Sequence, residues 1–260
     1  MRCVLLLLAT FIFSACDKTP PAQGQALRVG MSMNYPPFEM RDELGEPAGV
    51  SVDLAHALGT SLGRPVTFEN MPFDGLMPAL KTGRIDVVIS SMSATDDRRQ
   101  SIDFSEPYLR TGLCLLVGAK TDIQSAANLD RPGRKVAVLK ATTGHLWAAD
   151  HLKQADLLVL GEESVAALEV SQGKADAFIY DQMSVLRNWL ARPDATRALL
   201  KPFREESWAI ALRKGDDELR GKVNAFLTEF RGSGGFDRLG GKWLGGQKAQ
   251  FSKLGVPFVF

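Results

Sequence analysis

The chain has 260 residues, which is enough for one large domain or two small ones, and its 45% hydrophobic and 23% charged residues are ordinary for a globular protein. A formal net charge of +1 gives no reason to expect a nucleic acid or an anionic membrane surface as a partner. The three histidines lack the helical i, i+4 spacing of a metal site, and the sequence contains no Cys-x-x-Cys pair, Gly-rich phosphate loop or G-x-S-x-G motif. We therefore expect no metal and no cofactor.

The first residues are typical of a targeting segment. Arg2 precedes an apolar run at residues 4–13, which is too short to cross a bilayer and fits the central region of a signal peptide. Residues 13–16, Phe-Ser-Ala-Cys, resemble a lipobox, the site where signal peptidase II cleaves and Cys16 receives a lipid. The resemblance implies a lipoprotein anchored to a membrane and working outside the cytoplasm, in the periplasm.

A plain signal peptide is the alternative. Phe13 stands where a lipobox prefers Leu, and residues 24–26, Gly-Gln-Ala, would suit ordinary cleavage although they lie far from the apolar run. We expect a lipoprotein-type signal peptide at residues 1–15, followed by a polar, Pro-containing tether at residues 16–26. The mature protein is extracytoplasmic with either kind of cleavage.

The cysteines leave no internal disulfide. Cys3 is removed with the signal peptide and Cys16 would be acylated, so Cys114 is the one thiol left. It lies in an apolar run, where a free thiol packs as a small hydrophobic group. The fold must therefore be stabilised by burial, which a chain of this size can provide.

The first half of the chain alternates strands and helices. Two prolines after the first strand lack N–H donors and fix φ, so they predict a loop that carries Tyr35 and Phe38. Ser51 is expected to cap the helix that follows. The expected elements are strand 27–31, helix 52–62, strand 66–69, helix 76–82 and strand 85–89. Repeated strand-loop-helix units predict parallel strands joined by right-handed crossovers.

The same pattern starts again after residue 113. The expected elements are strand 113–117, strand 135–139, helix 145–154, strand 157–160, helix 164–172, strand 175–180, helix 182–190, strand 208–212, helix 216–230 and a short helix ending at residue 243, before an apolar tail. Two α/β units therefore share the chain. Polar residues follow several strands, and open α/β sheets bind ligands at the carboxyl ends of their strands.

An anion site is indicated between residues 85 and 108. The buried strand there ends in hydroxyl residues, and Thr95 can cap a short helix. Arg98 lies in the first turn of this helix, where a cation opposes the helix dipole, so its placement indicates a bound anion. The alternative is a solvated turn of Asp and Arg side chains with little energetic value.

Several segments, taken together, resemble the periplasmic polar amino-acid-binding proteins of ABC importers, bacterial solute-binding protein family 3. They are TDDRRQSIDFSEPY from Thr95, PPFE from Pro36, MPFDGLMPAL from Met71 and KGDDELRGKVN from Lys214. The resemblance covers residues 27–243. Val50 and Ser51 depart from the family pattern, which has a larger apolar residue and an acid there.

The resemblance implies a two-lobed, type II periplasmic-binding-protein fold of class α/β. Each lobe would be a mostly parallel sheet flanked by helices, and two strands would cross between the lobes as a hinge. Lobe one would comprise residues 27–111 and 205–260, and lobe two residues 112–204. The ligand would lie in the cleft between the lobes.

The resemblance also implies the contacts of the ligand's α-carboxylate. Arg98 would clamp it, assisted by Ser91, Ser93 and the loop N–H of Thr143. A guanidinium suits this role because its planar fork meets a carboxylate with two charge-assisted hydrogen bonds.

The remaining contacts come from both lobes. Asp181, together with the carbonyl of Ser91, would hold the α-ammonium, and Tyr35 and Phe73 would enclose the ligand between aromatic rings. The positions expected to face the ligand side chain are Ser32, Ser90, Thr142 and Tyr180. Each residue also has an ordinary structural role open to it: Asp181 as a helix cap, the aromatic rings as core, the threonines as a turn.

The expected function is a monomeric receptor that binds an amino acid and delivers it to an ABC transporter permease. An enzyme of the cyclohexadienyl dehydratase type remains an alternative on this fold, with Glu39, Glu163 and Asp181 as available acids. A sensor domain or an accessory protein of a periplasmic redox enzyme are further alternatives. The hydroxyl groups indicate a moderately polar pocket without a second charge, which disfavours strongly cationic or dicarboxylic ligands.

Overall fold

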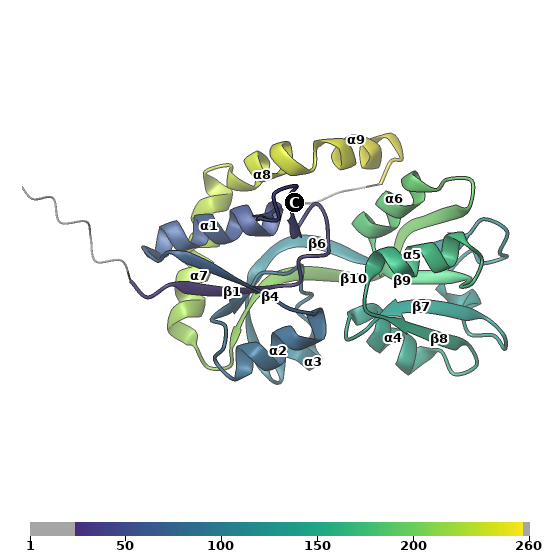
Figure 1. Cartoon of the computed structure of the whole chain (residues 1–260), viewed down its shortest axis with the longest axis horizontal. Helices are drawn as coiled ribbons and strands as arrows, with labels where there is room; N and C mark the ends of the chain where they lie inside the picture. The colour runs from purple at the N-terminus through teal and green to yellow at the C-terminus, as the bar shows by residue number, and fades with distance from the viewer. Residues whose placement is uncertain (1–23, 257–260) are drawn as a thin grey trace, which may run out of the picture.

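Two long strands run through the molecule and connect its two halves (Figure 1). The computed structural model describes residues 24–256, so the expected signal peptide, Cys16 and most of the tether lie outside the described residues. β6 (Ile102–Gly118) and β10 (Thr196–Arg213) pair antiparallel, and Gly112 lies opposite Glu205 where they cross from one half to the other. Each half is an α/β unit built around one end of this pair.

Eight strands of the described residues form one sheet with the order β4-β1-β5-β10-β6-β9-β7-β8, and β2 and β3 pair with each other in a separate two-stranded sheet. β1 is parallel to β4 and β5, and β7 is parallel to β8 and β9, whereas β5 and β9 are antiparallel to the central pair. The expected mostly parallel sheet in each half is confirmed. The other strands are β1 (Leu27–Met31), β2 (Met40–Arg41), β3 (Pro47–Ala48), β4 (Val66–Asn70), β5 (Val87–Val88), β7 (Lys135–Leu139), β8 (Asp156–Leu160) and β9 (Ala177–Asp181).

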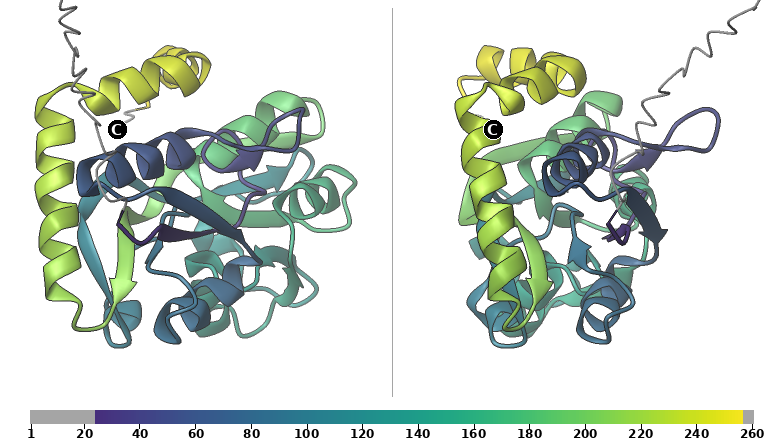
Figure 2. Two further views of the ribbon diagram at one scale, coloured as in Figure 1. Left: turned by 60° about the vertical axis from the view of Figure 1, so that its left-hand side comes forward. Right: turned by 90° about the vertical axis from the view of Figure 1, so that its left-hand side faces the viewer.

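Helices cover both faces of each half. In the first half, α1, α7 and α8 pack against one another, and Figure 2 shows α7 along one side with α8 and α9 across its end. In the second half α4, α5 and α6 surround β7 to β9. The helices are α1 (Val50–Leu62), α2 (Phe73–Lys81), α3 (Asp96–Arg99), α4 (Thr143–His151), α5 (Glu163–Ser171), α6 (Gln182–Ala191), α7 (Asp217–Gly232), α8 (Gly235–Trp243) and α9 (Gly245–Lys253), with a 3-10 turn at Ala126–Asn128.

Neighbouring side chains of a strand pack into two different apolar layers, one on each face of the sheet. Val87 belongs to the cluster that includes Leu54 and Phe226 of α1 and α7, whereas its neighbour Val88 belongs to the cluster that includes Leu80 of α2. Successive side chains of a strand point to opposite faces, so this is the expected pattern of a sheet buried on both sides. The strands of the first half are therefore packed against helices on both faces of the sheet.

Four expectations about the elements are wrong. β6 begins at Ile102 rather than at residue 113, and β10 begins at Thr196 rather than at residue 208. α9 occupies part of the expected apolar tail. Gly49 rather than Ser51 is the N-cap of α1, and Ser51 is fully buried in the first turn. Its hydroxyl is used elsewhere, as described below. Within residues 24–256, none of the helices is long and apolar enough to span a bilayer.

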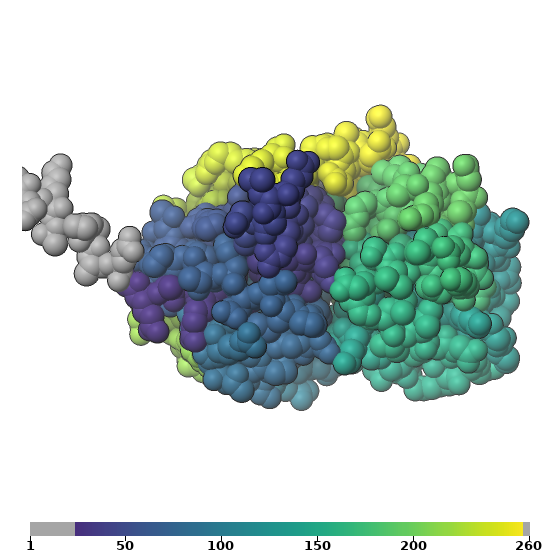
Figure 3. All heavy atoms as spheres, in the orientation of Figure 1, coloured from purple at the N-terminus to yellow at the C-terminus, as the bar shows by residue number. Residues whose placement is uncertain are grey.

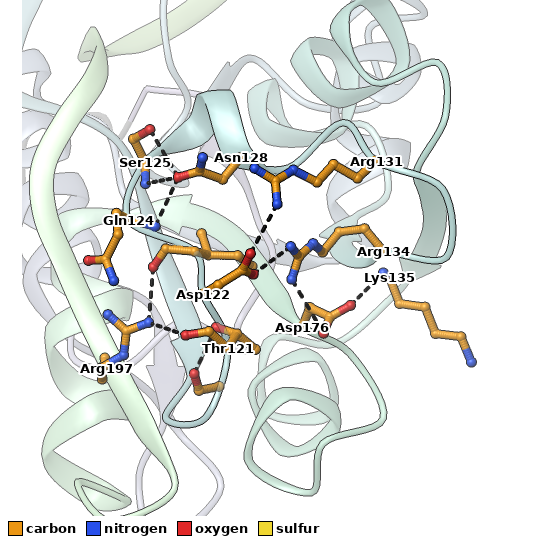
Figure 4. A network of polar contacts seen from close by, with 12 residues as sticks. Thr121, Asp122, Gln124, Ser125, Asn128, Arg131, Arg134, Lys135, Asp176 and Arg197 are labelled. Carbon is orange, nitrogen blue, oxygen red and sulfur yellow. Dashed lines mark hydrogen bonds and ion pairs between the residues drawn. The ribbon is translucent and has the colours of Figure 1, made fainter.

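The far end of the second half is held by a network of polar contacts (Figure 4). Asp122 accepts hydrogen bonds from Arg131 at 3.0 Å and Arg134 at 2.7 Å. Arg134 also approaches Asp176 at 3.8 Å, and Asp176 accepts the backbone N–H of Lys135 at 2.8 Å. Exposed pairs of this kind are individually weak, but a network shares the cost of ordering each side chain. The network fixes the connection between β6 and β7.

Candidate ligand-binding site

A cavity of about 300 Å³ lies where the two halves meet, and Figure 3 shows the seam between them. Its size is at the lower end for a small-molecule site. Strand ends of both halves contribute to its wall, as expected for open α/β sheets. All the ligand-contact residues expected from the sequence line it: Ser32, Tyr35, Phe73, Ser90, Ser91, Ser93, Arg98, Thr142, Thr143, Tyr180 and Asp181.

Arg98 reaches the cavity from α3. Thr95 is the N-cap of this helix, and its side chain accepts the N–H of Arg98. Arg98 is 5% exposed, and its guanidinium donates to the backbone oxygens of Ser93 at 2.8 Å and Ala141 at 3.0 Å, so it contacts both halves. It also lies over the ring of Phe73, 5.5 Å from the centroid. Burial lowers the pKa of Arg98 to about 10, which still leaves it charged at neutral pH.

Asp181 faces the same cavity from the second half. It ends β9 and caps α6, and its Oδ1 accepts the N–H groups of Met183 at 2.9 Å and Ser184 at 3.2 Å. Asp181 therefore caps helix α6 and also lines the cavity. Oδ1 also accepts the hydroxyl of Tyr35 at 2.6 Å, a contact between the two halves. Burial raises the pKa of Asp181 to about 6, although the hydrogen bond from Tyr35 acts in the opposite direction.

Tyr35 is a fixed wall of the cavity. Its ring stacks on Phe38 at 5.5 Å and meets the edges of Tyr180 and Trp208 at 5.8 Å and 5.9 Å. The guanidinium of Arg187 lies over the same ring at 5.5 Å from its centroid. Aromatic contacts of this geometry hold a ring in one orientation. The hydroxyl of Tyr35 is thereby directed at Asp181.

The loops that reach the cavity contain unusual backbone conformations. Ser91 has φ 48° and Ala141 has φ 62°, the region that residues with a Cβ rarely adopt. Within the described residues these are the non-glycine positions with positive φ, and each one contributes to the Arg98 environment or the cavity wall. Strain of this kind concentrates at functional sites because the surrounding structure must maintain it.

Glu39 is a cavity residue that the sequence did not single out as a ligand contact. It is 1% exposed, and its carboxyl accepts hydroxyl hydrogen bonds from Ser51 at 2.6 Å, Ser91 at 3.1 Å and Ser90 at 3.5 Å. Burial raises the pKa of Glu39 to about 8, against the effect of these hydrogen bonds, so the carboxyl is mostly protonated at neutral pH. The Ser51 hydroxyl therefore binds Glu39 instead of capping α1.

Glu206 is the second carboxylate that was missed. Its side chain is 5% exposed, and its Oε2 accepts the hydroxyls of Ser93 at 2.6 Å and Thr143 at 2.9 Å. The expectation of a pocket without a second charge is therefore wrong. The sequence signal was the pair of glutamates before Trp208, where the strand's alternation turns one of them outward and the other inward.

Two further contacts join the two halves beside the cavity. Lys140 and Asp74 form an ion pair at 2.8 Å, and the amide of Asn34 donates to Glu162 at 2.8 Å. Asp74, Lys140 and Asn34 all line the cavity. The two halves are therefore in direct contact next to the cavity.

A larger and more open hollow, of about 1190 Å³, lies alongside the crossing strands. It shares Ser93 and Glu206 with the cavity, and its other lining residues include exposed charged side chains such as Arg99 and Lys201. Asp181 and the aromatic wall do not reach it. Across residues 24–256 there is also no cluster of three His, Cys, Asp or Glu side chains that could hold a metal ion. The smaller cavity is therefore the candidate site.

Comparison with known proteins agrees with this geometry. Residues 27–246 match the model of the bacterial extracellular solute-binding proteins, family 3. The L-arginine-binding protein of Pseudomonas aeruginosa is 31% identical to this chain, over 92% of this chain and 96% of its own length.

Solved structures show the same fold. An ancestral arginine-binding protein bound to arginine is 35% identical with a TM-score of 0.78, covering 86% of this chain and 100% of that one. An ancestral amino acid-binding protein, a precursor of cyclohexadienyl dehydratase, is 35% identical with a TM-score of 0.77, covering 85% of this chain and 95% of that one.

Proposed function

This chain belongs to the bacterial extracellular solute-binding proteins of family 3, and we propose that, as the amino-acid-binding component of an ABC importer, it holds its ligand by both ends of a zwitterion. The observation that carries the proposal is that Arg98 and Asp181, from opposite halves, line one cavity. A guanidinium and a carboxylate placed in this way match an α-carboxylate and an α-ammonium.

The carboxylate end would be bound in the first half. The Ser93 hydroxyl already donates to Glu206, so Arg98 and backbone N–H groups are the donors left for the ligand. The low accessibility of Arg98 strengthens such a bond, because little water competes with the ligand.

The ammonium end would be bound by Asp181. Its hydrogen bonds within the described part of the chain all use Oδ1, which leaves Oδ2 available to an ammonium group. The bond requires an ionised carboxylate. The pKa of about 6 therefore predicts that amino acids bind more weakly as the pH falls below 6.

Binding would be coupled to closure of two lobes, residues 27–111 with 205–260 and residues 112–204. The boundaries lie within β6 and β10, which are the connections that would bend. The ligand docks on Arg98, and closure then adds Asp181 and Thr143. A ligand favours the closed state only through contacts that it makes there and lacks in the open state.

The chain is a binding protein, as the relatives are, rather than an enzyme. We propose that it serves a permease in the membrane, that it works in the periplasm as a monomer, and that a lipid on Cys16 anchors it. Labelling of the expressed protein with a radioactive fatty acid, compared with a Cys16→Ala variant, tests the anchor. Equal labelling of both proteins would contradict it.

A thermal-shift screen against all the amino acids tests the function, because a ligand that binds only the folded state raises the melting temperature. Calorimetry of Arg98→Ala with the best ligand is expected to show a loss of at least about 2–5 kcal/mol, as for truncation of one partner of a buried charge pair. Asp181→Asn should weaken amino acids more than analogues without an ammonium. Unchanged affinity in Arg98→Ala would reject the site, and aromatic product from prephenate would support the dehydratase alternative instead.

A further inference from the structure

Tyr35 joins the two halves through contacts that involve no ligand. Its ring is held in the first half by aromatic neighbours. The second half reaches it at three points: Tyr180 meets its edge at 5.8 Å, Asp181 accepts its hydroxyl at 2.6 Å, and the guanidinium of Arg187 lies 5.5 Å from its centroid. Tyr180 and Asp181 also line the cavity, whereas Arg187 is not among the described residues that line it. Arg187 therefore contacts Tyr35 from outside the space that a ligand would fill.

A buried carboxylate holds Arg187 in this place. Glu163, the first residue of α5, has 5% of its side chain exposed and accepts hydrogen bonds from Arg187 of α6 at both of its oxygens. It also accepts from the hydroxyl of Ser184 and from the amide of Asn188, the latter at 2.7 Å. These four residues all belong to the second half, so we expect their arrangement to persist when the two halves separate. The contact with Tyr35 would then be lost.

A guanidinium can make both contacts at once. Its N–H groups point outward from its edge and bind a carboxylate, while its flat face can lie on an aromatic ring. Glu163 takes N–H groups of Arg187, and the ring of Tyr35 lies within the distance at which a cation and an aromatic face attract each other. The Tyr35 hydroxyl donates to Asp181, which leaves more negative charge on the ring and favours the cation.

The residue next to Glu163 makes a parallel contact with the first half. Glu162 accepts the side-chain amide of Asn34 at 2.8 Å, and Asn34 directly precedes Tyr35. Two consecutive residues at the start of α5 therefore hold two consecutive residues of the first half, one directly and the other through Arg187. Two points of contact fix this loop against α5 better than one would.

Resting on the proposed function, we propose that Arg187 is a positioning residue that holds the closed form together through the ring of Tyr35 and thereby slows the release of a bound amino acid. The contact exists only when the halves meet, so it favours the closed form. The apparent affinity of a ligand follows the fraction of chains that can adopt the form it prefers. Removing the contact should therefore speed opening and weaken binding by the same factor. Association should change little, because a ligand enters the open form, in which the contact is absent.

The test measures how fast an amino acid leaves the protein. The probe is the L-amino acid that gives the largest rise in melting temperature in the thermal-shift screen, carrying a radioactive label. After excess unlabelled amino acid is added, Arg187→Met should release the probe about 3- to 30-fold faster than the unmodified protein, and its dissociation constant should rise by the same factor. Arg192→Met, at the exposed C-cap of α6, removes the same charge and should release the probe at the unmodified rate.

Two further variants show whether the effect passes through the ring. Arg187→Met leaves Glu163 without its cation, so a double variant with Glu163→Gln and Arg187→Met removes both charges and keeps a hydrogen-bonding side chain beside Ser184 and Asn188. Its release should again be about 3- to 30-fold faster. In a Tyr35→Leu protein, adding Arg187→Met should no longer alter the release, because the ring that the guanidinium contacts is gone.

The outcomes separate the two proposals. If no amino acid binds the unmodified protein, the proposed function fails, and the role of Arg187 fails with it. If the probe binds but leaves a folded Arg187→Met protein at the unmodified rate, the receptor stands and the role of Arg187 is refuted. An equal acceleration by Arg187→Met in the Tyr35→Leu protein refutes it as well. Should Arg187→Met not fold, the double variant decides the question.

Discussion

Replacing Glu39 by glutamine should remove a large part of the pH dependence of stability. In the folded chain the pKa of Glu39 is raised from 4.5 to about 8 by burial, against hydrogen bonds from Ser51 and Ser91. Between these two values the folded chain keeps a proton that the unfolded chain loses. The free energy of unfolding therefore falls as the pH rises through this window and levels off above about pH 8. Over the whole window the loss is up to about 5 kcal/mol at about 1.4 kcal/mol per pH unit.

The clearest interval is from about pH 6.5 to about pH 8, because Asp181, with a pKa of about 6, has largely ionised by then. Tyr108, Tyr180 and Asp181 are the titratable groups that face Glu39, and burial raises the pKa of both tyrosines far above this interval. The unmodified protein should lose about 1–2 kcal/mol of unfolding free energy over the interval, from Glu39 alone.

Urea denaturation at several pH values measures this loss. Glu39→Gln cannot ionise and keeps the size of the side chain, so its unfolding free energy should vary much less over the same interval. Glu43→Gln, an exposed position, serves as the control and should follow the unmodified protein. Parallel curves for the unmodified protein and Glu39→Gln would refute the conclusion that Glu39 is held protonated.

Three further results are expected. Gly112→Ala should destabilise the protein by about 1–3 kcal/mol in urea titrations, because the new Cβ would lie 2.5 Å from a backbone oxygen of β10, whereas Gly221→Ala has open space and should not. Cys114 should stay unreactive toward a thiol reagent until the protein unfolds, since it is fully buried and burial raises its pKa, and labelling of the native protein would contradict this. Tyr35→Phe should weaken amino-acid binding by about 1–2 kcal/mol. It should also raise the pH below which binding is lost, because the pKa of Asp181 would rise without the hydrogen bond from Tyr35. An unchanged pH profile in calorimetry would argue against this role of Tyr35.

The sequence predicted most elements because their patterns are local. Leu27–Met31 and Lys135–Leu139 form strands with the expected bounds, and Thr95 caps α3 as expected. The early part of β10 was missed because it has no apolar alternation and contains Pro202, so only its pairing with β6 makes it a strand. A tertiary contact decided the structure there.

The candidate site was partly predictable for the same reason. Arg98 and Asp181 lie beside strand ends, and the resemblance to a family assigned them to facing lobes. Glu206 was not predicted as a site residue because its partners, Ser93 and Thr143, lie 113 and 63 residues away in the sequence. Glu39 was not predicted as a ligand contact, although it belongs to the PPFE segment that resembles the family. Its burial against three serine hydroxyls depends on the folded structure. The charge of a pocket depends on such distant partners.

We expect the ion pair between Lys140 and Asp74, which joins the two halves beside the cavity, to affect how quickly a ligand leaves. Lys140 is 65% exposed and Asp74 33% exposed, whereas Arg98 and Asp181 are buried. Dissolved salt weakens an exposed ion pair much more than a buried one. The residence time of a bound ligand should therefore shorten at high ionic strength while the internal bonds keep most of their strength. A dissolved ion that competes for Lys140 should have the same effect.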